Sequence, residues 1–364
     1  GHTKPAAGWP VVIFGHGLRG DRTQMLRMAD TAAAAGYAVI AIDAVLHGIR
    51  PEDSSLAPFY IENTRFADVA NERTFNVDYA NNTTGELVPD GITDPSGQWA
   101  VNLLSLLTQR DNLRQTQVDF STLAVSVPAI SFDGDALPDL DGSTIKWVSI
   151  SGGSVIAPAI VASDPLITGA FMSVGGGGIA RLLNGSDFYG PLIQGTLKSL
   201  AGIEPGMPEY ESYLQVWQTV IESVDPINWA DEVSRFNDVV VHEVIGDDTV
   251  PNFVPGAPLS GTEPMIRAMG LKPYSSTQTN PAGVDLVGRF VPPATHGSLL
   301  DPTSSPAAFA EMQKQLGSFL ASGGTTVVVE DASTMVTVPE EPGTSSEKSD
   351  PVDKKHNPMD KKGG

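Results

Sequence analysis

Short runs of apolar, β-branched residues recur along the chain and are separated by segments with helical periodicity. Their hydrophobicity is continuous rather than alternating, which is typical of short strands that are buried on both faces. Six segments have this character, at residues 9–14, 37–43, 144–150, 167–174, 238–246 and 284–291. Helical patterns occupy several intervals between or after them, at residues 21–36, 98–123 and 306–324. The pattern predicts an α/β fold with a mostly parallel central sheet and helices on both faces.

Three segments do not follow this strand–helix repeat. Residues 44–97 are polar and predicted to be an irregular insertion, and residues 251–283 are rich in Pro, Gly, Ser and Thr and predicted to be a long loop. Residues 180–235 have apolar side chains at helical spacing between two predicted strands, where a helical lid can be inserted. We expect Trp217 of this lid to line a substrate pocket, although an ordinary amphipathic helix docked on the domain fits the pattern equally well.

The C-terminal region is predicted to close the domain. Residues 325–331 and 334–338 have the character of a hairpin or of edge strands. From residue 339 onward the chain has almost no apolar side chains. The sequence therefore predicts one catalytic domain over residues 1–338, including the insertion and the lid, and a disordered tail over residues 339–364.

Charge and composition exclude several classes of function. The formal net charge is −21, which opposes binding to nucleic acid and stable binding to anionic membranes. The chain has no cysteine, so disulfides, thiolate nucleophiles and cysteine metal ligands are excluded. The acidic stretch 133–143 lacks the order of glycine and glutamate that a calcium loop requires, and a solvated turn is the better interpretation. We expect neither a metal nor a cofactor, and the sequence does not indicate the oligomeric state.

A candidate nucleophile lies in the sequence Lys146 to Ile160, KWVSISGGSVIAPAI, which runs from a predicted strand into a helical pattern. In hydrolases with a serine on a strained strand-to-helix turn, the residues two before and two after the serine must be small. Ser151 satisfies this rule with Ser149 and Gly153, giving S-x-S-x-G in place of the usual G-x-S-x-G. Ser154 does not, because Ile156 follows it by two positions.

An oxyanion hole is predicted from FGHGLRG, at residues 14–20, which ends the first predicted strand. In this type of site the loop after that strand supplies one N–H donor, and the residue after the nucleophile supplies the other. These rules assign the N–H groups of Leu18 and Gly152. We also expect His16 to line the pocket, together with His47 in AIDAVLHG.

The general base follows from elimination among six histidines. His296, in PPATHGSLLDP, comes after the last predicted core strand, where this arrangement delivers its histidine. The carboxylate that orients it should follow the strand ending near residue 245, and GDDTVPN at 246–252 offers Asp247, with Asp248 as the alternative. The resulting triad is Ser151, Asp247 and His296. It predicts a serine carboxylic-ester hydrolase, and the altered turn leaves a catalytically inactive surface-binding module as the alternative.

Several stretches together resemble the bacterial virulence-factor lipase family. They are GWPVVIFGHGLRGDR, AIDAVLHG, TQRDNLRQ, DLDGS, VIGDDTVPN and THGSLLDP. The resemblance implies an α/β-hydrolase fold, ester hydrolysis without a cofactor, and the same three catalytic positions. It also implies a protein that is secreted by, or attached to the outer membrane of, a Gram-negative bacterium. We expect that the export signal of such a protein is absent from this sequence. Similar sequences among polyester-cleaving carboxylesterases extend the expected substrates from acyl esters and lipids to polyesters.

Overall fold

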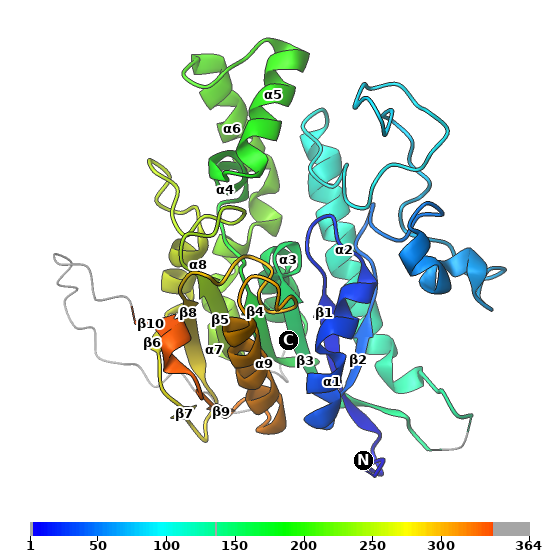
Figure 1. Cartoon of the computed structure of the whole chain (residues 1–364), viewed down its shortest axis with the longest axis vertical. Coiled ribbons are helices and arrows are strands. Elements are labelled where there is room, and N and C mark those ends of the chain that lie inside the picture. Colours follow the sequence, from blue (N-terminus) through cyan, green and yellow to red (C-terminus); the bar gives the residue numbers. More distant parts are fainter. Residues whose placement is uncertain (1–2, 135–136, 338–364) are drawn as a thin grey trace, which may run out of the picture.

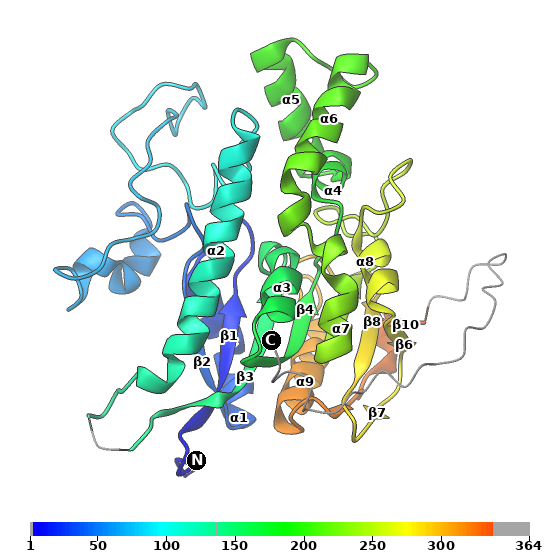
Figure 2. The same cartoon turned by 180° about the vertical axis from the view of Figure 1, so that it is seen from behind.

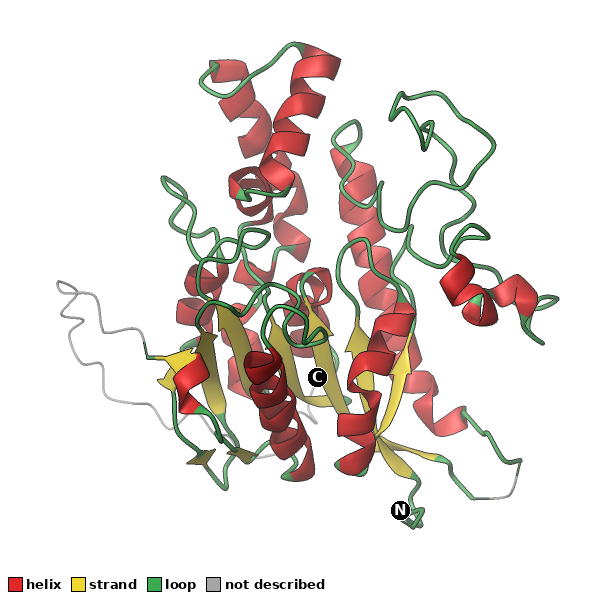
Figure 3. Ribbon diagram, in the orientation of Figure 1, coloured by secondary structure: helices red, strands yellow, loops and turns green. Residues whose placement is uncertain are grey.

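A computed structural model describes residues 3–134 and 137–337, and it contains a central sheet flanked by helices (Figures 1 and 3). The predicted tail, residues 339–364, lies outside the described residues. Within the described residues the central sheet has eight strands. They are β1 (Trp9–Gly15), β2 (Ala38–Ala41), β3 (Leu140–Ile150), β4 (Ile167–Ser173), β5 (Asp238–Val244), β6 (Lys272–Tyr274), β8 (Asp285–Phe290) and β10 (Met335–Val336).

The strand order is β10-β8-β5-β4-β3-β1-β2, with β6 paired to β8 outside this path. Neighbouring strands from β2 to β8 run parallel, and β10 is antiparallel to β8. All six predicted strands are confirmed, with ends that differ by up to four residues. Because the central strands are parallel, their carboxyl ends lie at one edge of the sheet, and the loops that follow them can share one site.

Helices cover both faces of the sheet, as predicted. The helices α1 (Leu26–Ala34) and α9 (Pro306–Ala321) pack on one face, where they bury side chains such as Val12 and Phe171. The opposite face, seen in Figure 2, carries α2 (Leu106–Ser126), α3 (Gly152–Ser163), α7 (Ala230–Phe236) and α8 (Thr262–Met269). Along β3, Val148 belongs to the first core and Trp147 to the second, which explains why the strand is apolar at consecutive positions. The described residues have the α/β-hydrolase fold.

Three helices form a cap that rises above the carboxyl edge of the sheet (Figure 1). The cap consists of α4 (Ile179–Gly185), α5 (Tyr189–Ala201) and α6 (Pro208–Ile221), and it has its own apolar core. The predicted lid extended to residue 235, but α7 at its end packs against α3 and α8 in the helical layer of the sheet. The helical lid therefore ends with α6 and the short 3₁₀ turns that follow it, before α7 begins.

Other predicted elements need correction. The helix expected at 98–123 begins eight residues later, because the Ser105 side chain caps α2 by accepting a hydrogen bond from the Thr108 N–H. The loop expected at 251–283 contains α8, β6 and β7 (Gln278–Thr279), which are short elements obscured by many Pro and Gly residues. At the C-terminus the edge-strand alternative is confirmed rather than the hairpin, because β9 (Thr326–Val327) pairs with β7 and β10 pairs with β8 at the edge of the central sheet.

The predicted insertion, residues 44–97, is irregular apart from the short 3₁₀ helices Ser54–Phe59 and Ile61–Asn63. In Figure 1 it lies beside the upper half of α2. No helix within 3–134 and 137–337 is both long enough and apolar enough to cross a membrane.

Candidate active site

Ser151 occupies the turn between β3 and α3 in a strained backbone conformation. Its φ and ψ angles are 54° and −122°, a combination that residues with a side chain rarely adopt and that costs on the order of 1–3 kcal/mol. The Ser151 N–H donates a hydrogen bond to the Ser173 carbonyl at 2.9 Å, which ties the turn to the end of β4. The turn therefore holds Ser151 at the carboxyl edge of the sheet, as a nucleophile elbow does.

The small neighbours of Ser151 are required by close packing. A Cβ atom on Gly153 would lie 2.1 Å from the Gly15 carbonyl oxygen, so no larger residue fits there without backbone movement. Ser149, at the position where the usual pattern has glycine, is fully buried, and its hydroxyl lies 2.9 Å from the Ser154 hydroxyl. This hydrogen bond compensates for burying both hydroxyls and leaves Ser154 inside the core rather than at the site.

The loop after β1 lies directly against the Ser151 turn. A Cβ atom on Gly17 would lie 3.3 Å from the Ser151 Cβ, and one on Gly152 would lie 2.6 Å from the Leu18 backbone nitrogen. The Gly17 N–H donates to Gln24 Oε1 at 2.9 Å. The N–H groups of Leu18 and Gly152 form no hydrogen bond with any described residue. The geometry thus brings the two predicted oxyanion donors together at the turn.

Asp247 and His296 are joined by a hydrogen bond although they are 49 positions apart. His296 Nδ1 lies 2.7 Å from Asp247 Oδ2, and the Asp247 side chain is almost completely buried. The other Asp247 oxygen, Oδ1, accepts hydrogen bonds from the Thr249 and Val250 N–H groups at 2.9 and 3.0 Å. The alternative, Asp248, is exposed and accepts a bond from the Thr249 hydroxyl instead. Of the two acids, only Asp247 orients the imidazole.

Ser151 and His296 are not hydrogen-bonded to each other in this structure. The remaining imidazole nitrogen, His296 Nε2, is buried and has no hydrogen-bond partner among the described residues. Ser151 follows β3 and His296 follows β8, and the carboxyl ends of these strands lie at the same edge of the sheet. In Figure 1 the loop after β8 crosses the upper ends of the strands at the level where α3 begins.

The two predicted pocket histidines lie side by side behind the oxyanion loop, with ring centroids 4.9 Å apart. His16 Nε2 accepts from the Ala44 N–H at 2.9 Å, so its Nδ1 carries the proton and donates to the Gly17 carbonyl at 2.9 Å. Burial lowers the pKa of His16, which favours this neutral ring. His47 Nδ1 lies 2.9 Å from the Val45 carbonyl, and burial, followed by the proximity of the His16 ring, lowers the pKa of His47 to about 3. Both rings are neutral structural elements of the pocket wall.

An apolar pocket opens beside Ser151, with a volume of about 100 Å³. It is bounded by the oxyanion loop, α2, the start of α3 and the cap. Its lining includes His16 and His47, as predicted, together with Gly152, Val101, Leu113, Val155, Ile156, Ile179, Leu182, Leu183, Tyr189 and Val250. An apolar pocket next to a polar turn fits an acyl chain attached to a reactive carbonyl.

Trp217 does not line this pocket, so the prediction for that residue is wrong. The indole is fully buried in the core of the cap, beside Leu214 and Ile221. The indole lies on the apolar helical face that the spacing predicts, but that face packs into the core of the cap rather than toward the pocket. Sequence periodicity does not distinguish these two environments.

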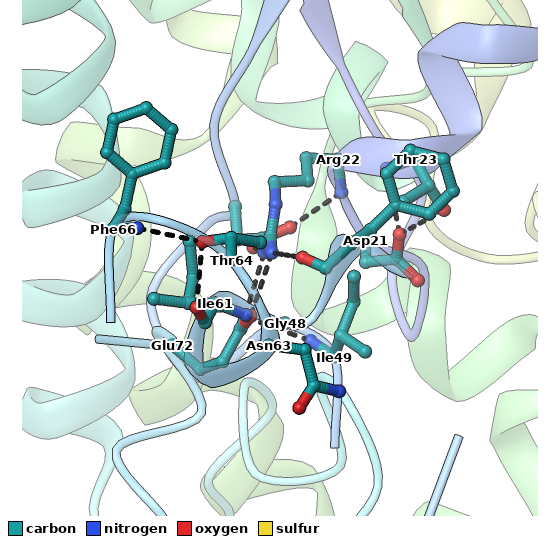
Figure 4. Close-up of polar contacts among 12 residues, drawn as sticks. Asp21, Arg22, Thr23, Gly48, Ile49, Ile61, Asn63, Thr64, Phe66 and Glu72 are labelled. Atoms are coloured by element: carbon teal, nitrogen blue, oxygen red, sulfur yellow. Dashed lines mark hydrogen bonds and ion pairs between the residues drawn. The ribbon is translucent and has the colours of Figure 1, made fainter. Parts of the chain in front are cut away.

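A largely buried ion pair joins Glu72 of the insertion to Arg22, two residues after the oxyanion loop, as Figure 4 shows. Both terminal nitrogens of Arg22 bond to Glu72 at 2.8 Å, and one also contacts Asp43. Glu72 in turn accepts hydrogen bonds from the Ile49 and Ile61 N–H groups at 3.1 and 2.9 Å. Burial opposes the charge on Arg22, but Glu72 and Asp43 outweigh it and raise the pKa of Arg22. Burial also opposes the charge on Glu72, but its hydrogen bonds with Arg22 outweigh this and lower the pKa of Glu72, whereas burial raises the pKa of Asp43.

Ser96 makes a second link between the insertion and the oxyanion loop. Its hydroxyl donates to the Gly20 carbonyl at 2.6 Å and accepts from the Gly48 N–H at 3.1 Å. The Gly97 N–H donates to the Leu46 carbonyl at 2.9 Å close by. Sequence analysis singled out none of Arg22, Glu72 and Ser96. The sequence indicates charged side chains after the oxyanion loop, at Asp21 and Arg22, but it does not indicate that Arg22 pairs with Glu72, 50 residues away.

The acidic stretch 133–143 is occupied by protein contacts where it is described. Lys4 Nζ lies 2.7 Å from Asp139, and the Phe132 N–H also donates to that carboxylate. Asp135 lies outside the described residues. Among the residues that are described, no three His, Asp or Glu side chains are arranged to hold a metal ion.

No known family model matches the sequence, and no curated protein matches it. Solved structures of similar fold include acetyl xylan esterase 1 from Thermoanaerobacterium sp. JW/SL YS485, at 14% identity and a TM-score of 0.48, covering 84% of this chain and 74% of that one. Another is the Paleococcus ferrophilus monoacylglycerol lipase, at 12% identity and a TM-score of 0.45, covering 87% of this chain and 96% of that one. Because both TM-scores are below 0.5, the fold assignment rests on the sheet topology described above.

Proposed function

We propose that this chain is a serine hydrolase of carboxylic esters, of the esterase or lipase type. The observation that carries the proposal is the Asp247–His296 hydrogen bond at the same sheet edge as the strained Ser151 turn. This pairing orients an imidazole whose other nitrogen has no partner among the described residues. Such an imidazole can accept a proton from a nearby hydroxyl, which a serine needs in order to become a nucleophile.

In the proposed reaction Ser151 Oγ attacks the ester carbonyl while His296 Nε2 takes its proton. The negative charge that develops on the carbonyl oxygen is stabilised by the N–H groups of Leu18 and Gly152. His296 then gives the proton to the leaving alcohol, and an acyl-enzyme remains on Ser151. Water activated by the same imidazole hydrolyses the acyl-enzyme, and Asp247 stabilises the imidazolium in each half-reaction. Ser151 Oγ and His296 Nε2 must come within hydrogen-bond distance for this step, and such contacts commonly tighten when substrate binds.

The lining of the pocket supports acyl esters or lipids as substrates, and polyesters as an extension of the same chemistry. The space beside Ser151 is apolar and small, which suits a chain of methylene groups rather than a sugar.

The motifs quoted above, which resemble virulence-factor lipases, support a secreted or outer-membrane location. Fractionation of the source cells with an antibody against the chain tests the location, and a purely cytoplasmic signal would reject it.

The catalytic proposal is tested by Ser151→Ala with p-nitrophenyl butyrate. We expect kcat/KM to fall about 10⁴-fold or more, because no nucleophile remains. The matched control is Ser126→Ala at the exposed end of α2, which should retain the activity of the unaltered chain. Thermal unfolding of both variants establishes that they are folded. Comparable turnover by Ser151→Ala would reject the assignment, and an inactive unaltered chain would favour the binding-module alternative.

A further inference from the structure

A second and larger groove lies between the insertion and helix α5 of the cap. Its volume is about 620 Å³. One wall is formed by residues 80–104 and the other by α5, which contributes Leu192, Thr196 and Leu200. Uncharged polar side chains from Gln98, Asn102 and Ser199 alternate with the apolar ones. The groove therefore offers both apolar and hydrogen-bonding surface to a ligand.

This groove continues from the pocket beside Ser151. Leu18, Val101, Leu183 and Tyr189 line both spaces, so these four side chains form their common boundary. Because Leu18 also supplies a proposed oxyanion donor, the boundary lies next to the position of the reacting carbonyl. A substrate held at Ser151 can extend across the boundary into the groove.

Charge distinguishes this groove from the rest of the molecule. The net charge of the chain is −21, yet no Asp or Glu lines the groove, and Arg19 is the only charged side chain in its described lining. Arg19 is exposed and, among the described residues, has no ion pair, hydrogen bond or ring contact. The other arginines each contact a carboxylate or an aromatic ring. The unpaired guanidinium is thus specific to this position.

The position of Arg19 is also fixed by its surroundings. Arg19 has a φ angle of 65°, in the left-handed region that favours glycine, and the Gly20 N–H closes the turn on the Gly17 carbonyl at 2.9 Å. Ser96 holds the same turn through Gly20. Arg19 lines the groove together with Leu18 and Tyr189, two of the four side chains at its boundary with the pocket. The turn therefore presents Arg19 to the boundary between the two spaces.

We propose that the groove is a second substrate subsite in which Arg19 pairs with an anionic group of the substrate. The ligand is an ester that carries a carboxylate or a phosphate some distance from its reacting carbonyl. The uncharged lining avoids repulsion of such a group, and the guanidinium forms charge-assisted hydrogen bonds with it. This inference rests on the proposed ester hydrolysis, because it names the class of ester.

The test measures kcat/KM for p-nitrophenyl half-esters of dicarboxylic acids, from succinate to sebacate, and for the corresponding neutral methyl diesters. A second arm uses p-nitrophenyl esters of ω-phosphonocarboxylic acids and their neutral dialkyl phosphonates. The unaltered chain should prefer an anionic member of the series to its neutral counterpart. Arg19→Gln should lower the anionic-to-neutral ratio about tenfold, and Arg19→Lys should restore part of it. If Arg19→Gln lowers this ratio more for the carboxylates than for the phosphonates, the natural anion is a carboxylate. The opposite result identifies a phosphate.

Arg235→Gln, at an exposed end of α7 away from the groove, is the matched control and should leave the ratio unchanged. Gly195→Trp is a second test, because a Cβ on Gly195 meets no atom within 4 Å and a side chain there would fill the groove. It should reduce turnover of the longer half-esters more than that of the shorter ones. An unchanged ratio in Arg19→Gln would show that Arg19 is only a solvated surface residue. Failure of the unaltered chain to cleave neutral esters would instead reject the proposed function.

Discussion

Ser151 illustrates how single residues determine the geometry of the candidate site. Its φ of 54° is compatible with the fold only because Gly153 leaves room for the Gly15 carbonyl and Ser149 hydrogen-bonds to Ser154. These requirements concern size and local polarity, which can be read from the sequence. For this reason the small-residue rule located the turn correctly even though the usual first glycine is absent.

A residue-scale prediction distinguishes the two neighbouring acids. Asp247→Asn should lower kcat/KM about 10²–10⁴-fold, because an amide cannot stabilise the imidazolium and favours the wrong tautomer. Asp248→Asn is the matched control, since that side chain is exposed and, within the described part of the chain, hydrogen-bonds only with the Thr249 hydroxyl. Hydrolysis of p-nitrophenyl butyrate measures both. The assignment is wrong if the Asp248 variant loses more activity than the Asp247 variant.

At the scale of elements, the succession of strands and helices along the chain could be predicted from the sequence. The contacts between loops could not. Continuous apolar runs identified six of the eight strands of the central sheet, because strands covered on both faces are apolar throughout, but the short β6 inside the predicted loop 251–283 was missed. The ion pair between Arg22 and Glu72 joins residues 50 positions apart, and no local pattern encodes such a pairing. Trp217 was misplaced for a related reason, because an apolar helical face does not specify its partner. The role of the insertion therefore became visible only in three dimensions.

The insertion is expected to stabilise the oxyanion loop through Glu72. Glu72→Ala leaves the largely buried Arg22 with one of its two carboxylate partners and should destabilise the chain by about 2–4 kcal/mol. We also expect kcat for butyrate esters to fall more than KM changes, because the adjacent Leu18 N–H loses its fixed position. Glu52→Gln, an exposed acid in the same insertion, is the control.

Urea unfolding and steady-state kinetics measure the two effects of Glu72→Ala separately. Faster proteolysis within residues 44–97 should accompany the loss of stability. A variant with unchanged stability and unchanged kcat would show that the insertion does not position this loop.

At the scale of the whole molecule, a buried charge cluster connects the sheet to helix α8. Arg289 Nε on β8 lies 2.8 Å from Glu243 on β5 and 2.7 Å from Glu263 on α8. One guanidinium thus faces two carboxylates in the interior. Burial, and then the charge of Glu263, raises the pKa of Glu243 to about 8, although Arg289 opposes the shift. Burial therefore favours the protonated form of Glu243 in the folded state.

This cluster predicts how stability depends on pH. The folded-state pKa of Glu243 is above its ordinary value of 4.5, so the folded chain binds the proton more tightly than the unfolded chain does. The associated stability is complete below about pH 4.5 and is lost as pH rises through about 8. Glu243→Gln removes this titration while keeping a neutral side chain.

Calorimetry between pH 6 and pH 9 should therefore show that the Tm of the unaltered chain falls by roughly 2 °C or more relative to that of Glu243→Gln. Glu52→Gln, whose parent side chain is exposed, should follow the unaltered chain throughout. Parallel Tm curves for the unaltered chain and Glu243→Gln would show that Glu243 is already ionised at neutral pH.

The central claim is that Ser151 is an activated nucleophile, and covalent labelling tests it most directly. The chain is treated with a fluorophosphonate, and the modified residue is identified by peptide mass spectrometry. We predict one adduct on Ser151, and a strongly reduced labelling rate in His296→Ala because the proton acceptor is missing. An unlabelled Ser151 in the folded chain, or an adduct that forms on another serine instead, would contradict the account.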